Sequence, residues 1–467
     1  MSGLLKYIIC FFLASVLVAG CKKDKLITDS SAKLEFSLDT VVFDTVFTTI
    51  GSTTHQLKVY NRNSETILIS SIRVAGGSGS PFRINVDGLP GSTFTEIEIA
   101  GKDSLYIFIE VTINPTSGFL PFIVKDSIVF ETNGNIQDVD LVVWGQDAHF
   151  FNGSIICDMT WVNDKPYVIY NSILVDSGCT LTIEPGVKVY SHTNSAIYVY
   201  GTLVVNGGNS EHVVFQGDRT ESYFDDVTGQ WLGIFLLRGS TNNFFDHTDI
   251  RNAFYGISVG SSTSSDLGTF TFANAPDVLI RRSIISNMLY TGIFGFLSFI
   301  TVENTLVYNC GQHVAHLAFG GVYNFNHVTM ASYSNSIVNH SEAILELGNF
   351  AETSQGHYSA DINATFTNCI IDGSLDDELV YDDDEIAAFD FQFDNCMLKT
   401  KKSASDSNYT FVILNKNPIY ILSSEFNFHI SSNSPARDAG VATTVLDDIE
   451  ENPRAGFPDI GAYEYIP

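Results

Sequence analysis

One serine in the chain lies in a sequence context that is typical of catalytic nucleophiles. Residues 256–260 read GISVG and match the GxSxG pattern of the nucleophile elbow. In that elbow the serine lies on a sharp turn between a strand and a helix, beside an oxyanion hole. The residues that follow, SSTSSDLG, do not start a helix. We therefore interpret 256–260 as part of a β-strand without a catalytic serine.

Three histidines are close enough in sequence to be examined as metal ligands. His313 and His316 are three residues apart, and His327 follows eleven residues later. On a strand, residues i and i+3 point to opposite faces, so a shared ion would need a turn between them. The chain has no HExxH motif and no cysteine pair near these residues. We expect the histidines to be solvated or buried in a core.

The acidic run DDELVYDDDEIAAFD, from Asp376 to Asp390, is the densest group of charges in the chain. Calcium takes six to eight oxygen ligands, so this run could bind it, but the spaced order of an EF-hand loop is missing. We interpret the run as a solvated loop that projects between two repeats. Calcium is the one cofactor that the sequence leaves open, and no other is expected.

An eight-residue pattern that recurs six times must position these side chains. Its copies start at Phe245, Ile280, Val302, Phe325, Phe366 and Phe393. The first and sixth positions are apolar in every copy, and the eighth is Asn or another small or turn-forming residue. Successive starts lie 35, 22, 23, 41 and 27 residues apart. A spacing near 22 is typical of one coil of a wide solenoid, and the longer gaps indicate inserted loops.

The spacing within the repeat predicts a bent strand. Positions four and six point the same way on a strand, whereas positions one and four would point to opposite faces. A bend at position two or three would turn all three inward. Position eight then starts a turn, where Asn tolerates left-handed backbone and can form a ladder with Asn of the next coil. An antiparallel barrel or a second sandwich is the alternative, but hairpin turns do not separate these runs.

Two further stretches carry a family resemblance. Residues 181–207 (LTIEPGVKVYSHTNSAIYVYGTLVVNG) resemble the opening coils of the pectate-lyase-like superfamily. The tail, with SPARDAG from Ser434, NPR from Asn452 and PDIGAYEY from Pro458, is similar to the motif that ends many secreted β-helix proteins. The resemblance implies a right-handed parallel β-helix over 148–430. Because a solenoid needs a polar cap, we expect 431–467 to cover its open end.

Pectate lyases of this superfamily hold calcium with acidic residues and place a basic residue on the same sheet face. Asp246, Asp249 and Arg281, with Arg251 and Arg282 beside them, fall in neighbouring repeats and would form such a ligand face if the chain were an enzyme. They occupy outward or bend positions, where any soluble coil carries charges. We therefore assign no catalytic residue and no metal ligand.

Residues 33–147 have a different pattern, with short alternating runs typical of β-strands. The runs DSIVFET and QDVDLVVWG flank Asn133-Gly134-Asn135, which is a strong hairpin signal. About seven or eight such strands in a domain of about 100 residues favour an immunoglobulin-like β-sandwich. The Cys-Trp-Cys core of antibody domains is missing. The sequence thus predicts an all-β protein, a sandwich followed by a β-helix.

The first residues predict export and a lipid anchor. Lys6 precedes an apolar run of twelve residues, Ile8 to Ala19, which is too short to span a bilayer. The run ends LVAGC, which resembles the lipobox of bacterial lipoproteins and implies cleavage before Cys21 and lipidation of its thiol. We expect 1–20 to be a signal peptide and 21–32 an anchor and tether. We therefore expect a lipid-anchored protein of the bacterial cell envelope and favour the outer membrane, with surface exposure as one alternative, because the sequence leaves the leaflet open.

The remaining cysteines do not form a disulfide framework. Cys157, Cys179, Cys310, Cys369 and Cys396 are odd in number and widely spaced. If a disulfide forms, we expect it between Cys157 and Cys179. Cys369 and Cys396 hold the same repeat position, so we expect stacked free thiols, because the strand spacing exceeds the Cβ separation of a relaxed disulfide.

Composition and charge exclude one class of partner. The formal charge of −29 opposes nucleic acid, and 45% hydrophobic residues provide a large core. The membrane is a partner only through the lipid. The function that we favour is binding of a polysaccharide or a surface protein along the outer coil face, without catalysis, with loops 261–277 and 333–360 as walls. A polysaccharide lyase or glycoside hydrolase and an adhesive or spacer protein are the alternatives.

Overall fold

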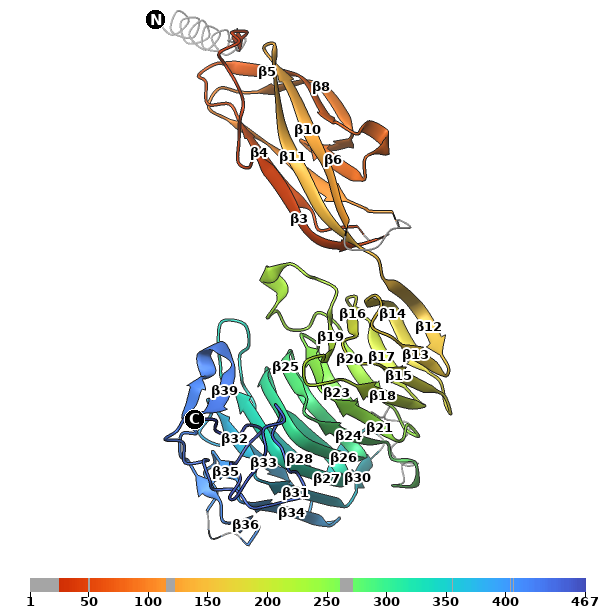
Figure 1. Ribbon diagram of the computed structural model, residues 1–467, viewed down its shortest axis with the longest axis vertical. Coiled ribbons are helices and arrows are strands. Elements are labelled where there is room, and N and C mark those ends of the chain that lie inside the picture. Colours follow the sequence, from red (N-terminus) through yellow and green to blue (C-terminus); the bar gives the residue numbers. More distant parts are fainter. Residues whose placement is uncertain are drawn as a thin grey trace, which may run out of the picture. The chain divides into compact units, whose positions relative to one another are not determined.

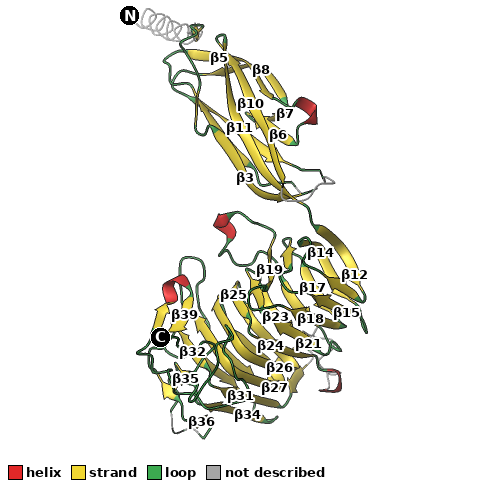
Figure 2. Ribbon diagram, in the orientation of Figure 1, coloured by secondary structure: helices red, strands yellow, loops and turns green. Residues whose placement is uncertain are grey.

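The computed structural model describes residues 25–48, 51–114, 122–260, 272–354, 356–403, 405 and 407–467. The signal peptide and Cys21 lie outside these ranges. The chain divides into two compact units, Met1–Asp147 and Ala148–Pro467. Both are built from strands, and only a few short helical turns interrupt them (Figure 2). Among the described residues, no helix is both long and apolar enough to cross a membrane.

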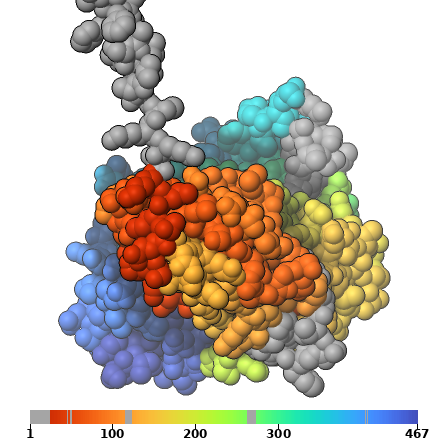
Figure 3. Space-filling model, turned by 90° about the horizontal axis from the view of Figure 1, so that it is seen from above, coloured from red at the N-terminus to blue at the C-terminus, as the bar shows by residue number. Residues whose placement is uncertain are grey.

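The first unit consists of two sheets around one core. The first sheet contains β1 (Leu26–Ile27), β3 (Thr40–Phe47), β5 (Thr66–Val74), β8 (Thr93–Ile99), β10 (Phe122–Thr132) and β11 (Asn135–Gln146). The second contains β2 (Glu35–Phe36), β4 (His55–Tyr60), β6 (Phe82–Val86), β7 (Leu89–Gly91) and β9 (Ser104–Val111). The residues of the first unit, red to gold in Figure 3, form one closely packed surface.

The alternation of inward and outward side chains and one tight turn explain how the longest strands of the first unit pair. Strands β10 and β11 are antiparallel and meet at Thr132 and Asn135. Asn133 and Gly134, with φ of 49° and 78°, form the turn that the sequence predicted. Phe43 of the first sheet lies 5.7 Å from Phe82 of the second, ring centre to ring centre, so the core lies between the sheets.

The second unit is a continuous parallel sheet of 24 strands wound into successive coils (Figure 1). The first half comprises β12 (His149–Ile156), β13 (Met159–Trp161), β14 (Tyr167–Val175), β15 (Thr180–Ile183), β16 (Lys188–Ser191), β17 (Ala196–Val199), β18 (Thr202–Asn206), β19 (Val213–Gly217), β20 (Gly233–Leu236), β21 (Asn243–Asp246), β22 (Thr248–Arg251) and β23 (Tyr255–Val259). The second half comprises β24 (Asp277–Arg281), β25 (Ile284–Met288), β26 (Thr291–Cys310), β27 (Ala315–Ser332), β28 (Leu345–Gly348), β31 (Ile362–Thr367), β32 (Ile370–Gly373), β33 (Leu379–Asp382), β34 (Phe389–Asp394), β35 (Met397–Leu398), β36 (Tyr409–Thr410) and β37 (Ile413–Leu414).

Two hairpins extend from these coils. They are β29 (Phe350–Thr353) with β30 (Gly356–Ser359), and β38 (Tyr420–Leu422) with β39 (Asn427–Ile430). Short 3₁₀ turns occur at Gly77–Gly79, Ser222–Phe224, Phe272–Asn274 and Ser423–Glu425.

The first positions of the six repeats form one column, which confirms the predicted register. Parallel pairing joins Phe245 to Ile280, Ile280 to Val302, Val302 to Phe325, Phe325 to Phe366, and Phe366 to Phe393. All six side chains are buried. The rings of Phe366 and Phe393 stack with centres 4.7 Å apart, close to the spacing of neighbouring strands.

The predicted bend lies at the third position of every repeat. His247, Arg282, Asn304, His327, Asn368 and Asn395 occupy it, and all six have φ between 42° and 54°. Three of the six are Asn, which tolerates this backbone, and the neighbouring coils impose the same geometry on the two His and the Arg.

Position eight carries a second ladder, of asparagines. Asn309 donates to Asn287 (2.6 Å), and Asn287 donates to Asn252 (3.3 Å). All three have left-handed backbone, as Asn at a turn tolerates. The predicted asparagine ladder is therefore present in the structure.

The free cysteines behave as small core residues. Cys310, Cys369 and Cys396 are buried and unoxidised. The backbone N–H of Cys369 donates to Sγ of Cys396 at 3.3 Å, so the two thiols stack in neighbouring coils. Cys157 and Cys179, 22 residues apart in the first coils, form a disulfide.

The C-terminal tail departs from the expected cap, because it lies along the side of the coils. The Ala462 N–H donates to Oγ1 of Thr329, and Asn304 and Asn395 donate their amide hydrogens to the carbonyls of Asp447 and Ala439. The bend at position three turns these amides outward, which supplies the donors that hold the tail.

One glycine of the tail motif is required by this contact. Gly461 has φ of 105°, and a Cβ there would lie 2.8 Å from both Ile370 Cδ1 and Thr329 Oγ1. Arg454 donates to the carbonyls of Asp447, Gly461 and Ala462 and pairs with Glu464. The PDIGAYE and NPR motifs are thereby explained by packing.

We expect the Cys157→Ser/Cys179→Ser double variant to lose about 3 kcal/mol of unfolding free energy, because the disulfide closes a loop of 22 residues in the unfolded chain. Urea denaturation with and without reductant measures this. Reductant should lower the unfolding free energy of the wild type to that of the double variant and should leave that of the variant unchanged. An equal response of both proteins would contradict the prediction.

Candidate functional site

A row of half-buried aromatic side chains follows the outer face of one strand column. We call Tyr198, Phe235, Phe254, Tyr255, Tyr290 and Phe294 the aromatic track. Their neighbours on the strands, such as Ile197, Ile234 and Ile293, point inward and are fully buried. Because side chains alternate along a strand, Tyr198, Phe235 and Phe294 face outward. Phe254, Tyr255 and Tyr290 lie where β23 and β26 begin, and their half-buried rings pack beside the outward ones.

The rings of the aromatic track lie close enough to form a continuous surface. The centre of the Tyr198 ring is 5.4 Å from that of Phe235, and Phe235 is 6.1 Å from Tyr255. Tyr255 lies 5.5 Å from Tyr290 and 6.4 Å from Phe294. Parallel pairing fixes these distances, because Tyr198 pairs with Phe235 across one coil.

The aromatic track continues into a cluster of ionisable residues. Phe294 pairs with His316 in the ladder, and His316 pairs with Glu346. The Glu346 carboxylate lies 3.2 Å from Nε2 of His313 and 3.3 Å from Nε2 of His316. The charge of Glu346 also acts on Asp382 of the next coil. We call these four residues the His–Glu cluster.

The two carboxyl groups of the His–Glu cluster differ in acidity. The hydrogen bond from His316 lowers the pKa of Glu346 against the effect of burial. Burial and the charge of Glu346 raise the pKa of Asp382. Burial lowers the pKa of His313, whose Nδ1–H donates to the carbonyl of Ala343. One carboxyl can thus hold a proton while its neighbour is ionised, an arrangement used in acid–base chemistry.

The histidine prediction is therefore only partly right. The turn from Gly311 to Val314 precedes β27 and lets His313 and His316 approach the same carboxylate. His327 lies elsewhere, at the bend of its repeat, where burial lowers its pKa to about 2. Within the described ranges, no group of three or more His, Cys, Asp or Glu residues has the geometry to hold a metal ion.

Of the residues of the expected ligand face, Asp246 and Arg281 meet, but Asp249 does not join them. Asp246 accepts hydrogen bonds from Arg281 (2.8 Å) and Arg282 (2.7 Å). Asp249 instead contacts Nδ1 of His212 at 2.9 Å. Arg282 also lies 3.6 Å from Asp447 of the tail, so these ions help to hold the tail.

The Asp246 carboxylate is held in its charged form. Burial alone would raise its pKa, but hydrogen bonds from His247, Arg282 and Arg281 outweigh burial and lower it well below the usual range. The group therefore suits a structural role better than contact with a ligand.

The GISVG segment lies within the coil strand β23, as interpreted. Ser258 is 3% exposed and occupies the ladder between Phe235 and Phe294. The residues directly after Gly260, 261–271, lie outside the described ranges. Ser258 is thus a small residue at the ladder position between two rings of the aromatic track.

The acidic run differs from the projecting loop that we expected. Leu379–Asp382 forms coil strand β33, and Phe389 and Asp390 begin β34. Glu378 is fully buried against His340 at 2.9 Å, and Asp383 accepts from Asn349 at 2.7 Å. The reason for the difference is that inward Leu379 pairs with Leu345 and is buried, which draws the run into the coil.

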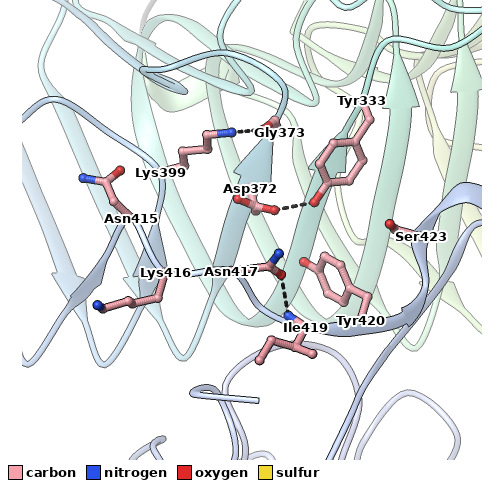
Figure 4. Close-up of a pocket in the computed structure, with 10 residues that line it drawn as sticks. All are labelled: Tyr333, Asp372, Gly373, Lys399, Asn415, Lys416, Asn417, Ile419, Tyr420 and Ser423. Carbon is pink, nitrogen blue, oxygen red and sulfur yellow. Dashed lines mark hydrogen bonds between the residues drawn. The ribbon is translucent and has the colours of Figure 1, made fainter. Parts of the chain in front are cut away.

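A pocket of about 480 Å³ lies on another strand column, between the coils and the segment 415–423 (Figure 4). Tyr333, Asp372, Lys399, Lys416 and Tyr420 line it, and Tyr333 donates a hydrogen bond to Asp372. A second pocket of about 330 Å³ shares Tyr333 and Ser423 with the first and adds Phe426 and Phe428.

Sequence reasoning missed the aromatic track, the His–Glu cluster and both pockets. The alternation in AIYVY and GIFLL could have marked Tyr198 and Phe235 as outward residues. No local signal pairs His316 with Glu346, 30 residues away, because the intervening loop is longer than one coil.

We expect Asp246→Asn to lower the free energy of unfolding by about 2 kcal/mol at pH 7, because two arginines lose their charged partner. The pKa of Asp246 is lower in the folded protein than in the unfolded chain, where it is about 3.9, so its carboxylate stabilises the fold at pH values above about 3.9. This stabilisation is lost as the pH falls through the folded-state pKa. The difference in unfolding free energy between variant and wild type should therefore become smaller below about pH 4. Urea midpoints at pH 7, 5 and 3 measure it, and a gap that is constant across this range would refute the role of the charge.

No protein-family model and no curated protein matches the chain. Among solved structures, the catalytic domain of a GH87 alpha-1,3-glucanase in complex with nigerose aligns at 9% identity over 78% of this chain and 88% of that chain, with a TM-score of 0.22. A family 123 glycoside hydrolase from Clostridium perfringens aligns at 11% identity (25% and 26% of the chains, TM-score 0.17). The E. coli chaperone DraB aligns at 13% identity (26% and 55%, TM-score 0.17).

These alignments span about a quarter of the family 123 hydrolase and about half of the chaperone. At such low identities and TM-scores, the likenesses carry no argument about activity. The functional argument therefore depends on the geometry of this chain.

Proposed function

We propose that the protein is an envelope lipoprotein whose second unit is a right-handed parallel β-helix that binds a glycan chain without cleaving it. An immunoglobulin-like sandwich precedes the β-helix. Support for the fold comes from the parallel ladders that join each repeat to the next, and from the tail motif packed along them. Support for the anchor comes from the sequence LVAGC before and at Cys21.

The observation that carries the binding proposal is the aromatic track. Its six rings are partly exposed, and the ring centres of contacting neighbours lie 5.4–6.4 Å apart along the coil axis. Sugar rings present apolar C–H faces that pack against aromatic side chains, whose large flat surfaces contribute much contact area. A row of rings along the solenoid suits an extended polymer, because each residue of the chain meets a similar surface.

The rigid ladder adds to the affinity of such a surface. Backbone pairing holds the track residues in place before the ligand arrives, so little conformational entropy is lost on binding. Phe235 and Phe294 extend from strands whose inward neighbours are fully buried. A flexible loop with the same residues would have to be ordered by its ligand.

A polysaccharide lyase or glycoside hydrolase is the second candidate, and the His–Glu cluster favours it. Glu346 and Asp382 are carboxyl groups of neighbouring coils with pKa values shifted in opposite directions, at the end of the aromatic track. Two-carboxylate glycosidases, however, keep their groups about 5–9.5 Å apart to admit the sugar or a water. The Glu346 carboxylate is instead bound to both His313 and His316, which occupies the group that a nucleophile or base would need free, and we therefore prefer binding.

We expect the Tyr255→Ala/Phe294→Ala double variant to bind its polysaccharide at least tenfold more weakly, which corresponds to about 1.4 kcal/mol. Affinity electrophoresis in gels that contain α-glucan, β-glucan, mannan, xylan or pectin identifies the polysaccharide and measures retardation. Phe411→Ala is the matched control, because Phe411 is 81% exposed and lies outside the track. Equal retardation of the double variant and the wild type would refute the proposal.

The same polysaccharides test catalysis. We expect no new reducing or unsaturated ends after prolonged incubation with the wild type. If products appear and both Glu346→Gln and Asp382→Asn abolish them while binding remains, the hydrolase or lyase replaces the binding protein as the function.

We expect Cys21→Ser to move the full chain from the membrane fraction to the soluble fraction, because the lipid would be its membrane affinity. Fractionation of cells and labelling with a radioactive fatty acid measure this. Unchanged membrane association of the variant would contradict the lipoprotein assignment and leave the binding proposal intact.

A further inference from the structure

The larger pocket contains polar groups that the protein itself leaves only partly bonded. The Tyr420 hydroxyl is buried and has no hydrogen-bond partner. Its ring packs edge-on against Phe428 with ring centres 5.1 Å apart, so the hydroxyl is held in position. In Figure 4 the hydroxyls of Tyr420 and Tyr333 point toward one another beside Asp372. A buried polar group without a partner is costly, and a ligand that bonded it would recover that cost.

The other groups around the pocket complete an arrangement of donors and acceptors. Tyr333 donates to Asp372, so the phenol oxygen of Tyr333 remains an acceptor. Asn417 uses its side-chain oxygen for the Ile419 N–H, which leaves the amide hydrogens facing outward as donors. Lys416 is exposed at the rim. Burial raises the pKa of Tyr420 and of Tyr333, so both phenols keep their protons.

We propose that this pocket is a second binding site, separate from the aromatic track, and that it takes a single neutral sugar residue. A pyranose carries hydroxyls that donate and accept in alternation, which match Asp372, the two phenols and the Asn417 amide. The volume of about 480 Å³ lies within the usual range of small-ligand pockets, about 300–1,000 Å³.

An anionic ligand fits the same pocket less well. It would face the Asp372 carboxylate, and the Lys399 ammonium already donates to the carbonyl of Gly373. An apolar ligand would leave the Tyr420 hydroxyl without a partner. A neutral polyol satisfies the hydroxyl and needs no counter-charge.

The neighbouring pocket shows where a second sugar residue would lie. It shares Tyr333 and Ser423 with the first pocket, and Phe426 and Phe428 provide an apolar wall. Asn309 and Asn335 also line it, and the Asn335 amide donates to Oδ1 of Asn309. A disaccharide that crosses Tyr333 would place one residue in each pocket.

Saturation-transfer NMR and calorimetry of the full chain with the methyl glycosides of glucose, galactose and mannose and with N-acetylglucosamine test this site. We expect millimolar or tighter binding of at least one sugar. Asp372→Asn should weaken it at least tenfold and Tyr420→Phe several-fold. Asn417→Ala, at an exposed position, should weaken it several-fold without affecting the fold, and urea midpoints verify that each variant is folded.

The track variant Tyr255→Ala/Phe294→Ala separates this inference from the proposed function. Monosaccharide binding should be unchanged in that variant, whatever its effect on polysaccharide retardation. Binding of none of the four sugars by the wild type would overturn the inference. So would binding that survives Asp372→Asn, Tyr420→Phe and Asn417→Ala together, or binding that the track variant abolishes.

Discussion

The left-handed backbone at the third position of each repeat is the constraint on which the second unit depends. It lets the side chains at positions one, four and six all point inward, as Phe366, Cys369 and Ile371 do. Without it, the strand would turn one of these apolar side chains to solvent. The same bend turns the third side chain itself outward. Asn304, Asn368 and Asn395 then meet the tail, so one backbone conformation both closes the core and anchors the C-terminus.

This arrangement separates the structural charges from the groups that are available to ligands. Asp246 with Arg281 and Arg282, and Arg454 with Glu464, lie where the tail meets the coils. The aromatic track lies on another strand column, and the pocket around Asp372 and Tyr420 on a third. A coil with several outer columns can therefore carry a clamp, a polymer surface and a pocket at once, each on a rigid ladder.

The His–Glu cluster shows how a repeated scaffold can acquire specialised chemistry. Phe235, Phe294 and His316 occupy equivalent outward positions in their strands, and Glu346 is the next along. A change of residue type along one column converts an apolar surface into an ionisable one without a change of backbone. Whether a ligand uses that end of the track is decided by the polysaccharide experiments rather than by the fold.

The sequence alone determined the strands, the repeat register and the bend, because these follow from alternation and from spacings of two and three residues within one repeat. Phe245 to Phe393 fall in one column as the pattern predicts, and Asn133-Gly134 forms the expected hairpin turn. Only the tertiary structure decided that the tail lies along the coils, that His316 meets Glu346, and that Tyr420 faces Tyr333 across a pocket. Those contacts join residues 30 to 133 positions apart, across coils whose lengths vary with their inserted loops, and no local pattern encodes where such loops return the chain.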